Sequence, residues 1–170
     1  MSTETLPSPA DIFAPELPDV PYPGLRPFEK HEWPLFFGRE RATQEVVELL
    51  LEHGLVVVHG SSGCGKSSLI RAGVLSRLEQ EHARSGLAWR TCAMRPGNAP
   101  TRNLARELAC LGATQADGER AEKLRRLIAR GPRAISALAE AVAAGPERRV
   151  CLLVDQFEEL FRFARETRVC

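Results

Sequence analysis

Residues 60–67 are the segment of this sequence whose residue types and spacing best suit chemistry. They read GSSGCGKS and fit the Walker A pattern GxxxxGK[ST], in which glycines let backbone N–H groups approach a phosphate without obstruction by side chains. Lys66 adds a mobile cation for phosphate oxygens, and the Ser67 hydroxyl is a hard oxygen ligand of the kind that Mg²⁺ prefers. We expect a nucleotide-binding loop rather than a flexible glycine turn, because a strand-like run precedes the pattern and a helical one follows it. The expected nucleotide contacts are Gly60, Ser61, Ser62, Gly63, Cys64, Gly65, Lys66, Ser67 and Ser68.

A second set of candidate residues follows the apolar run Val150–Val154. Residues 150–159 fit a Walker B pattern, in which a strand delivers an acid to the sheet edge where ligands bind. Asp155 and Ser67 are the predicted metal ligands, with Asp155 acting through water. Glu158 or Glu159, with Glu159 preferred, would orient the attacking water, which makes these two acids and Lys66 the candidate catalytic residues. The alternative is that these acids only interact with a helix dipole, and their pairing with a phosphate loop disfavours it.

The segment Phe36–Glu40 precedes the first predicted helix and has two interpretations. It could form a seat for the base and ribose, using a close backbone approach at Gly38 and the planar guanidinium of Arg39. It could instead be an aromatic anchor that fixes the angle at which the helix begins. The residues alone leave both interpretations open.

The elements that must position these residues alternate between strands and helices, which predicts an α/β fold with a parallel sheet. Hydrophobic periodicity predicts a buried strand at Leu55–His59 and a helix from the Walker A loop to near Gly86. Further strands are predicted at Ala88–Met94 and Arg149–Asp155. The remaining predicted helices cover residues 40–52, 101–111, 117–130 and 133–144, and one begins at Phe157.

The N-terminal region is rich in proline. Eight of the twelve prolines lie in the first 34 residues, so we expect an extended lead-in without helix or paired strand. Residues 1–21 are predicted to be disordered, and residues 22–170 to form one domain. The aromatic side chains of residues 22–28 and 33–37 are expected to pack on that domain.

Composition restricts the partners and the compartment. The 23 basic and 22 acidic side chains nearly cancel, so no overall basic field favours nucleic acid or an anionic membrane. The longest apolar runs are strand-sized, and the N-terminus lacks a signal peptide, so we expect a cytoplasmic protein without a membrane partner. The five cysteines form no CxxC pair and the four histidines share no ligand spacing, which disfavours a zinc site.

Five motifs together resemble the bacterial STAND NTPases, signalling ATPases related to the AAA and NACHT groups. In chain order they are YPGLRPF, LFFGRE, SSGCGKSSLIRAG, WR..MRPG and VDQFEELF, between about Tyr22 and Phe163. The resemblance implies ATP and Mg²⁺ as cofactors, ATP or ADP as the bound nucleotide, and an ATP-controlled switch as the function. It also implies that Gly38, Arg39 and Glu40 contact the nucleotide. Adenine is favoured over guanine by the resemblance and by the absence of an NKxD motif.

The resemblance also implies a three-layer P-loop NTPase fold of which this chain holds the N-terminal part. In such sheets the sensor strand follows Walker B in the chain and lies between the Walker A and Walker B strands. Its absence here predicts an incomplete sheet with open edges, self-association, and weak or no ATPase activity of the isolated chain. Two alternatives remain: a P-loop kinase of a small metabolite, and a non-catalytic interaction fragment.

Overall fold

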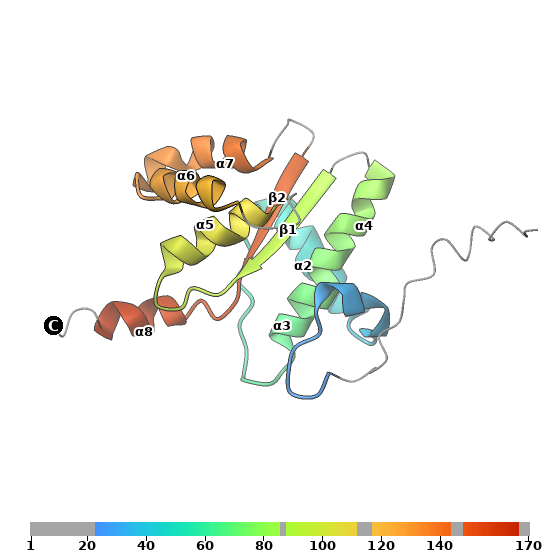
Figure 1. The fold of residues 1–170 in the computed structure, drawn as a ribbon. Coiled ribbons are helices and arrows are strands. Elements are labelled where there is room, and N and C mark those ends of the chain that lie inside the picture. Colours follow the sequence, from blue (N-terminus) through green and yellow to red (C-terminus); the bar gives the residue numbers. More distant parts are fainter. Residues whose placement is uncertain (1–22, 86–87, 112–116, 144–147, 167–170) are drawn as a thin grey trace, which may run out of the picture.

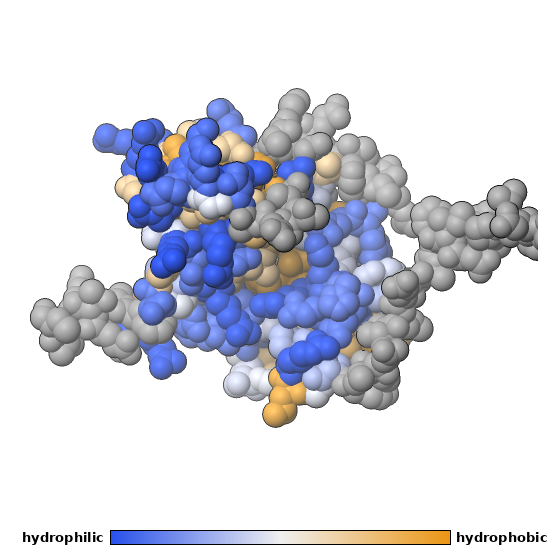
Figure 2. Space-filling view, viewed as in Figure 1, coloured by the Kyte–Doolittle hydropathy of each residue, from blue (hydrophilic) through white to orange (hydrophobic). Residues whose placement is uncertain are grey.

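The computed structural model describes residues 23–85, 88–111, 117–143 and 148–166 (Figure 1). The predicted disordered segment, residues 1–21, therefore lies outside the described residues, as does Gly86. Among the described residues, no helix is both long and apolar enough to cross a bilayer. Figure 2 shows that hydrophilic residues cover most of the visible face, with hydrophobic patches between them.

Two strands form a parallel pair at the centre of the molecule (Figure 1). Strand β1 (Ala88–Met94) and strand β2 (Arg148–Val154) pair in register from Ala88 opposite Arg148 to Met94 opposite Val154. Both predicted strands are thus confirmed to within a residue, together with the parallel arrangement. The Asp155 N–H donates to the Met94 carbonyl at 2.9 Å, so Asp155 continues the ladder at the carboxyl end of β2. The ladder therefore fixes the backbone position of Asp155.

The predicted strand Leu55–His59 is wrong, because the structure assigns no strand to these residues. The side chains alternate: Val56 and Val58 are half-buried, whereas Leu55 is 77% and Val57 79% exposed. A strand is defined by backbone hydrogen bonds to a neighbour, and the two described strands pair only with each other. The residues have the composition of a strand and lack a partner among the described residues.

Helices pack against both faces of the strand pair. One cluster joins Ala105, Leu108, Ala109 and Leu124 with Cys92 and Val150 of the strands. A second cluster joins Val47, Val74 and Leu78 with Trp89 and Cys151. Because successive strand residues point to opposite faces, Val150 and Cys151 carry these two clusters on the two sides of β2. In Figure 1 the strands accordingly lie between a group that contains α5, α6 and α7 and a group that contains α2 and α4.

The helices agree with the predicted ranges to within a few residues. Helix α2 is followed by Gly54 in the left-handed conformation (φ 73°), which ends it one residue after the predicted range. The 3₁₀ turn η3 precedes α7, and only its last two residues belong to the predicted helix 133–144. The bounds are α2 Glu40–His53, α5 Pro100–Cys110, α6 Gly118–Ile128, η3 Gly131–Ala134, α7 Ile135–Ala143 and α8 Glu159–Glu166.

A continuous helical stretch follows the Walker A loop and contains a π-helical segment. It consists of α3 (Lys66–Ser68), the π segment η2 (Leu69–Leu75) and α4 (Ser76–Ser85). The sequence predicts the helix but not the π segment, whose wider turns are rare and often occur at functional sites. Gly73 lies within it, where a Cβ would come within 2.5 Å of the Thr43 Oγ1 of α2. The glycine therefore permits the close contact between η2 and α2.

The expectation that the lead-in holds no helix is wrong, because Lys30–Leu35 forms the 3₁₀ helix η1 with Pro34 inside it. The Glu32 carboxylate accepts the Glu29 N–H at 2.8 Å, which satisfies a free donor at the start of the helix. Glu32 is only 1% exposed and pairs with Arg26 at 2.6 Å. Local capping thus forms a short helix despite the proline.

Candidate functional site

The Walker A loop leads directly into helix α3. Gly63 (φ 78°) and Gly65 (φ 85°) adopt left-handed backbone conformations, which a residue with a Cβ rarely adopts. The Lys66 ammonium group donates to the carbonyl oxygens of Gly60 at 2.9 Å and Ser61 at 2.8 Å. The lysine side chain therefore folds back over the loop that the sequence assigns to phosphate.

The structure brings together the two predicted metal ligands, which lie 88 residues apart in the chain. The Ser67 hydroxyl donates to Asp155 Oδ1 at 3.0 Å, and Asp155 is 8% exposed. A hydroxyl and a carboxylate are hard oxygen donors of the kind that Mg²⁺ takes, usually with phosphate oxygens and water completing the shell. Among the described residues, no group of three or more His, Cys, Asp or Glu side chains could hold a metal ion alone. A divalent cation between Ser67 and Asp155 would therefore depend on oxygens from a ligand or from water.

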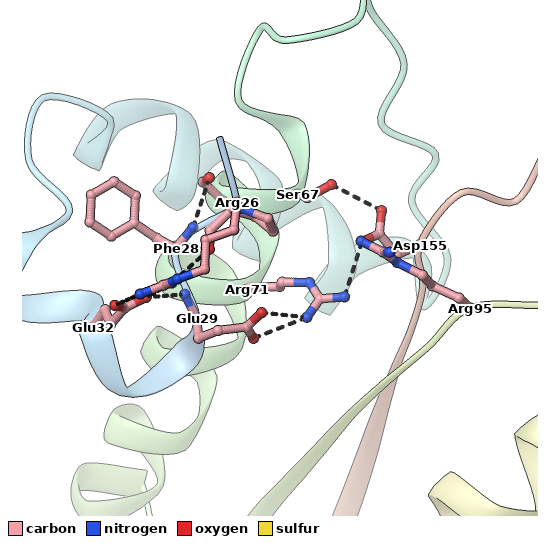
Figure 3. A network of polar contacts seen from close by, with 10 residues as sticks. Arg26, Phe28, Glu29, Glu32, Ser67, Arg71, Arg95 and Asp155 are labelled. Carbon is pink, nitrogen blue, oxygen red and sulfur yellow. Dashed lines mark hydrogen bonds and ion pairs between the residues drawn. The ribbon is translucent and has the colours of Figure 1, made fainter. Parts of the chain in front are cut away.

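Two arginines that the sequence patterns did not single out also face Asp155 (Figure 3). Arg71 Nη2 donates to Asp155 Oδ2 at 3.1 Å, and Arg95 Nε lies 3.8 Å from the same oxygen. Arg71 Nη1 also donates to both carboxylate oxygens of Glu29, at 2.9 and 3.0 Å. Burial lowers the pKa of Arg71, and the hydrogen bonds and charges of Glu29 and Asp155 outweigh this effect and raise it. The Asp155 carboxylate thus lies in a positive environment.

A sequence signal for Arg71 exists, because Arg71 lies four residues after Ser67 and belongs to the same face of a regular helix. Arg95 lies directly after β1, so the topology brings it to the same sheet edge as Asp155. Glu29 carries no such signal, because its contact with Arg71 spans 42 residues of chain.

The segment Gly38–Glu40 lies beside the Walker A loop. Arg39 Nη2 donates to the Cys64 carbonyl at 3.3 Å. Gly38 has a left-handed φ of 79°, and its N–H donates to Glu40 Oε1 at 2.9 Å. Backbone hydrogen bonds from the N–H groups of Glu40 and Gly38 lower the pKa of the Glu40 carboxyl group. These three residues are exposed to solvent, as a nucleotide contact would require.

The aromatic part of that segment has a packing role. The rings of Phe36 and Phe28 lie 5.7 Å apart and are tilted by 59°. Phe36 also donates its N–H to the Trp33 carbonyl at 3.1 Å. Phe36 therefore packs against the preceding chain, whereas Arg39 reaches the Walker A loop.

The two acids after β2 have different surroundings. Glu159 Oε2 accepts the N–H of Gly97 at 2.8 Å, so this carboxylate ties α8 to the loop after β1. Glu158 is exposed and lines the groove that also contains Lys66 and Asp155. Between them and Asp155, Gln156 has a left-handed φ of 57°, which turns the chain sharply after the strand. The geometry therefore favours Glu158 over Glu159 for contact with a ligand in the groove.

One predicted nucleotide contact has another partner. Ser68 Oγ accepts the Phe28 N–H at 3.1 Å, which directs the hydroxyl toward the chain before η1. Its neighbour Ser67 faces Asp155. The two serines of the loop motif thus contact different elements.

The site opens into a groove of about 1120 Å³. Its polar end holds Lys66, Ser67 and Asp155. Its apolar walls are residues 55–58 and 151–154, with Leu152 37% and Phe157 53% exposed. The groove therefore continues from the polar site along the edge of β2 that has no partner strand among the described residues.

One of three comparisons with known proteins gave a match. The sequence profile of the family described as Novel STAND NTPase 1 matches residues 21–169. Searches of curated proteins and of solved structures gave no significant match. The matched region includes the glycine-rich loop, Arg71, both strands and the acids after β2. The resemblance to STAND NTPases is thereby confirmed, and the chain belongs to the Novel STAND NTPase 1 family.

Proposed function

We propose that this chain is the Mg²⁺- and ATP-binding part of a STAND-type signalling ATPase that acts as a nucleotide-controlled switch. The observation that carries the proposal is the 3.0 Å contact between Ser67 and Asp155 at the end of a glycine-rich loop. Residues from two distant motifs meet there with the donor atoms that a phosphate-bound Mg²⁺ requires. Family membership supports a nucleotide as the ligand.

The proposal gives most of the predicted residues a role. The backbone of residues 60–65 binds phosphate, and Lys66 turns from the loop carbonyls to the β- and γ-phosphate oxygens. Ser67 and Asp155 hold Mg²⁺, which supplies charge neutralisation at the phosphates. Gly38, Arg39 and Glu40 contact the nucleoside of ATP or ADP, consistent with the bond from Arg39 to the Cys64 carbonyl.

Hydrolysis, where it occurs, depends on Glu158. Its carboxylate lines the groove beside Lys66 and Asp155, where it can orient a water molecule toward the γ-phosphate. The Glu159 carboxylate is engaged by the Gly97 N–H instead. We expect this chain to bind nucleotide better than it hydrolyses it, because within the described part of the chain no strand covers the edge of β2 along the groove.

The same proposal extends to the domain and its compartment. Residues 22–170 form the N-terminal part of a three-layer P-loop domain whose parallel sheet continues beyond β2. The protein works in the cytoplasm, where ATP and Mg²⁺ are available. Helix packing on both faces of β1 and β2 supports the three-layer arrangement of the domain.

Isothermal titration of the folded protein with ATP, with and without Mg²⁺, tests the binding function. Lys66→Ala should lower the ATP affinity about tenfold or more, because it removes the charged hydrogen bonds to phosphate. Lys123→Ala is the matched control, since Lys123 is an exposed lysine of α6 and should leave affinity unchanged. Equal affinities of the wild type and folded Lys66→Ala would refute the proposal. ADP formation that requires an added acceptor metabolite, with no release of free phosphate, would point to a kinase instead.

A further inference from the structure

The chain before and within η1 is attached to the helix that carries Ser67. We call Arg26–Leu35 the N-terminal segment. Its Phe28 N–H donates to Ser68 Oγ at 3.1 Å, and its Lys30 carbonyl accepts the Ser76 hydroxyl at 2.8 Å. Lys30 Nζ also pairs with Glu79 at 2.9 Å. The N-terminal segment thus follows one side of the helical stretch from the Walker A loop to α4.

Arg71 connects this attachment to the candidate metal site. Its guanidinium lies between Glu29 of the N-terminal segment and Asp155, bonded to both (Figure 3). The Arg71 side chain is 15% exposed, and its buried Nε has no hydrogen-bond partner within the part of the chain that the structure describes. The interaction of Arg71 with its surroundings therefore rests on the two carboxylates, which compete for one positive charge.

The competition bears directly on cation binding. A divalent cation beside Ser67 and Asp155 is repelled by Arg71 and Arg95, which lie 3.1 and 3.8 Å from Asp155 Oδ2. Glu29 counteracts this repulsion, because it attracts Arg71 away from Asp155. A cation would in turn draw the Asp155 charge toward itself and leave Arg71 more strongly bonded to Glu29. Effects of this kind are reciprocal, since two binding events that share one residue change each other's affinity by the same factor.

We propose that Arg71 is a positioning residue that couples cation binding at Ser67 and Asp155 to the attachment of the N-terminal segment through Glu29. This inference rests on the proposed function, because it requires a cation to bind with ATP at that site. The N-terminal segment then holds more tightly when the metal site is filled, and its release weakens cation binding. The nucleotide state is thereby transmitted to the N-terminal segment.

A double-mutant cycle tests the coupling, with Mn²⁺ as the spectroscopic probe in the presence of saturating ATP. Glu29→Gln should lower the Mn²⁺ affinity about fivefold, because Arg71 then pairs with Asp155 alone. Arg71→Gln should raise the affinity, and Glu29→Gln should have little further effect in the Arg71→Gln background. Glu79→Gln is the matched control, because Glu79 anchors the same segment through Lys30 without contacting Arg71. It should lower the Mn²⁺ affinity much less than Glu29→Gln does, because the contact between Glu29 and Arg71 remains.

A second variant covers the case in which Arg71→Gln does not fold. Arg71→Lys keeps the positive charge but replaces the planar guanidinium by a single ammonium group, which is a poor bridge between two carboxylates. In this background, too, Glu29→Gln should lose most of its effect. An undiminished effect of Glu29→Gln in the Arg71→Lys background would overturn the role of Arg71.

Hydrogen exchange measures the reciprocal effect. Amide exchange of a peptide covering residues 26–35 should slow about fivefold on addition of ATP with Mg²⁺. ATP with a chelator should give less protection, and Glu29→Gln should remove the Mg²⁺-dependent part. Wild-type binding of Mn²⁺ and ATP with no effect of Glu29→Gln on affinity or exchange would overturn the coupling alone. Absence of Mn²⁺ binding with ATP in the wild type would overturn the proposed function and the coupling with it.

Discussion

At the residue scale, Glu158 and Glu159 are neighbours in sequence and differ in what they contact. Glu158→Gln should abolish most ATP turnover with little change in ATP affinity, because its carboxylate lines the groove beside Lys66. Glu159→Gln should retain turnover, since an amide oxygen still accepts the Gly97 N–H. Turnover is measured as phosphate release from the folded protein in the presence of ATP and Mg²⁺. Selective loss of turnover in Glu159→Gln would show that Glu159 orients the water.

Residue types were sufficient to predict the polar centre of this site. The GxxxxGK[ST] spacing and an acid at the end of an apolar strand are local patterns, and the structure brings Ser67 and Asp155 together. The Glu29–Arg71 pair was missed because nothing in either residue's neighbourhood indicates a contact 42 residues away. The difference between Glu158 and Glu159 depends on the position of Gly97, which the sequence around the acids does not contain.

At the scale of the elements, η1 depends on one buried carboxylate. Hydrogen bonds from Arg26 and from the Glu29 N–H lower the pKa of Glu32 to about 2. A carboxyl group whose pKa is lower in the folded than in the unfolded chain stabilises the fold above its unfolded pKa, near 4.3. Its contribution should therefore be lost as the pH falls from about 4.5 to about 2.

Denaturant unfolding of Glu32→Gln tests this dependence. The variant should lose about 1–2 kcal/mol of unfolding free energy at pH 7, because it weakens the charged hydrogen bonds between Glu32 and Arg26, whose own side chain is 50% exposed. The loss should shrink as the pH approaches 2. Glu122→Gln is the control, since Glu122 also has a pKa of about 2 but is exposed on α6, where ion pairs contribute little. An equal, pH-independent effect of both variants would contradict the prediction.

The contact between η2 and α2 depends on the absence of a side chain at Gly73. Gly73→Ala should reduce the unfolding free energy by about 1–3 kcal/mol, because its Cβ would meet the buried Thr43 side chain. Gly118→Ala is the control, since a Cβ at Gly118 meets nothing within 4 Å. Thermal unfolding distinguishes the two variants, and a Gly73→Ala protein as stable as Gly118→Ala would show that the contact adjusts freely.

The elements also show where sequence patterns fail. Hydrophobic periodicity predicted β1, β2 and helices such as α2 and α5, because these elements contribute side chains to the two buried clusters. It failed at Leu55–His59, where β-branched residues favour a strand but the described chain offers no neighbouring ladder. The prediction from proline content failed at η1. Pro34 suggested an extended chain, whereas the Glu32 carboxylate stabilises a short helix.

At the scale of the whole molecule, the groove is bordered by one segment with no strand partner among the described residues and by the edge of a strand that faces away from its partner β1. Residues 55–58 form one border and β2 the other, and Leu55 and Val57 are strongly exposed. Unpaired strand-like segments associate with one another. We therefore predict concentration-dependent self-association and marginal stability of this chain.

Light scattering after size-exclusion chromatography, at several concentrations, measures the association. Val57→Lys should shift the protein toward monomer, because a charge on an open edge opposes pairing. Leu49→Lys is the control, since Leu49 is an exposed leucine of α2 outside the groove. A monodisperse wild-type monomer with a sharp, reversible melting transition would contradict the prediction.

The π segment Leu69–Leu75 sets the angular relation between the two ends of its helix. In an α-helix each residue turns the helix by about 100°, so converting a π turn to an α turn would rotate α4 relative to Ser67. Ser68 contacts the N-terminal segment before the π segment, and Ser76 and Glu79 contact it after the π segment. These three contacts can form together at only one rotation of α4 relative to α3. The N-terminal segment therefore stabilises the π-helical turn, because it contacts the helix on both sides of that turn.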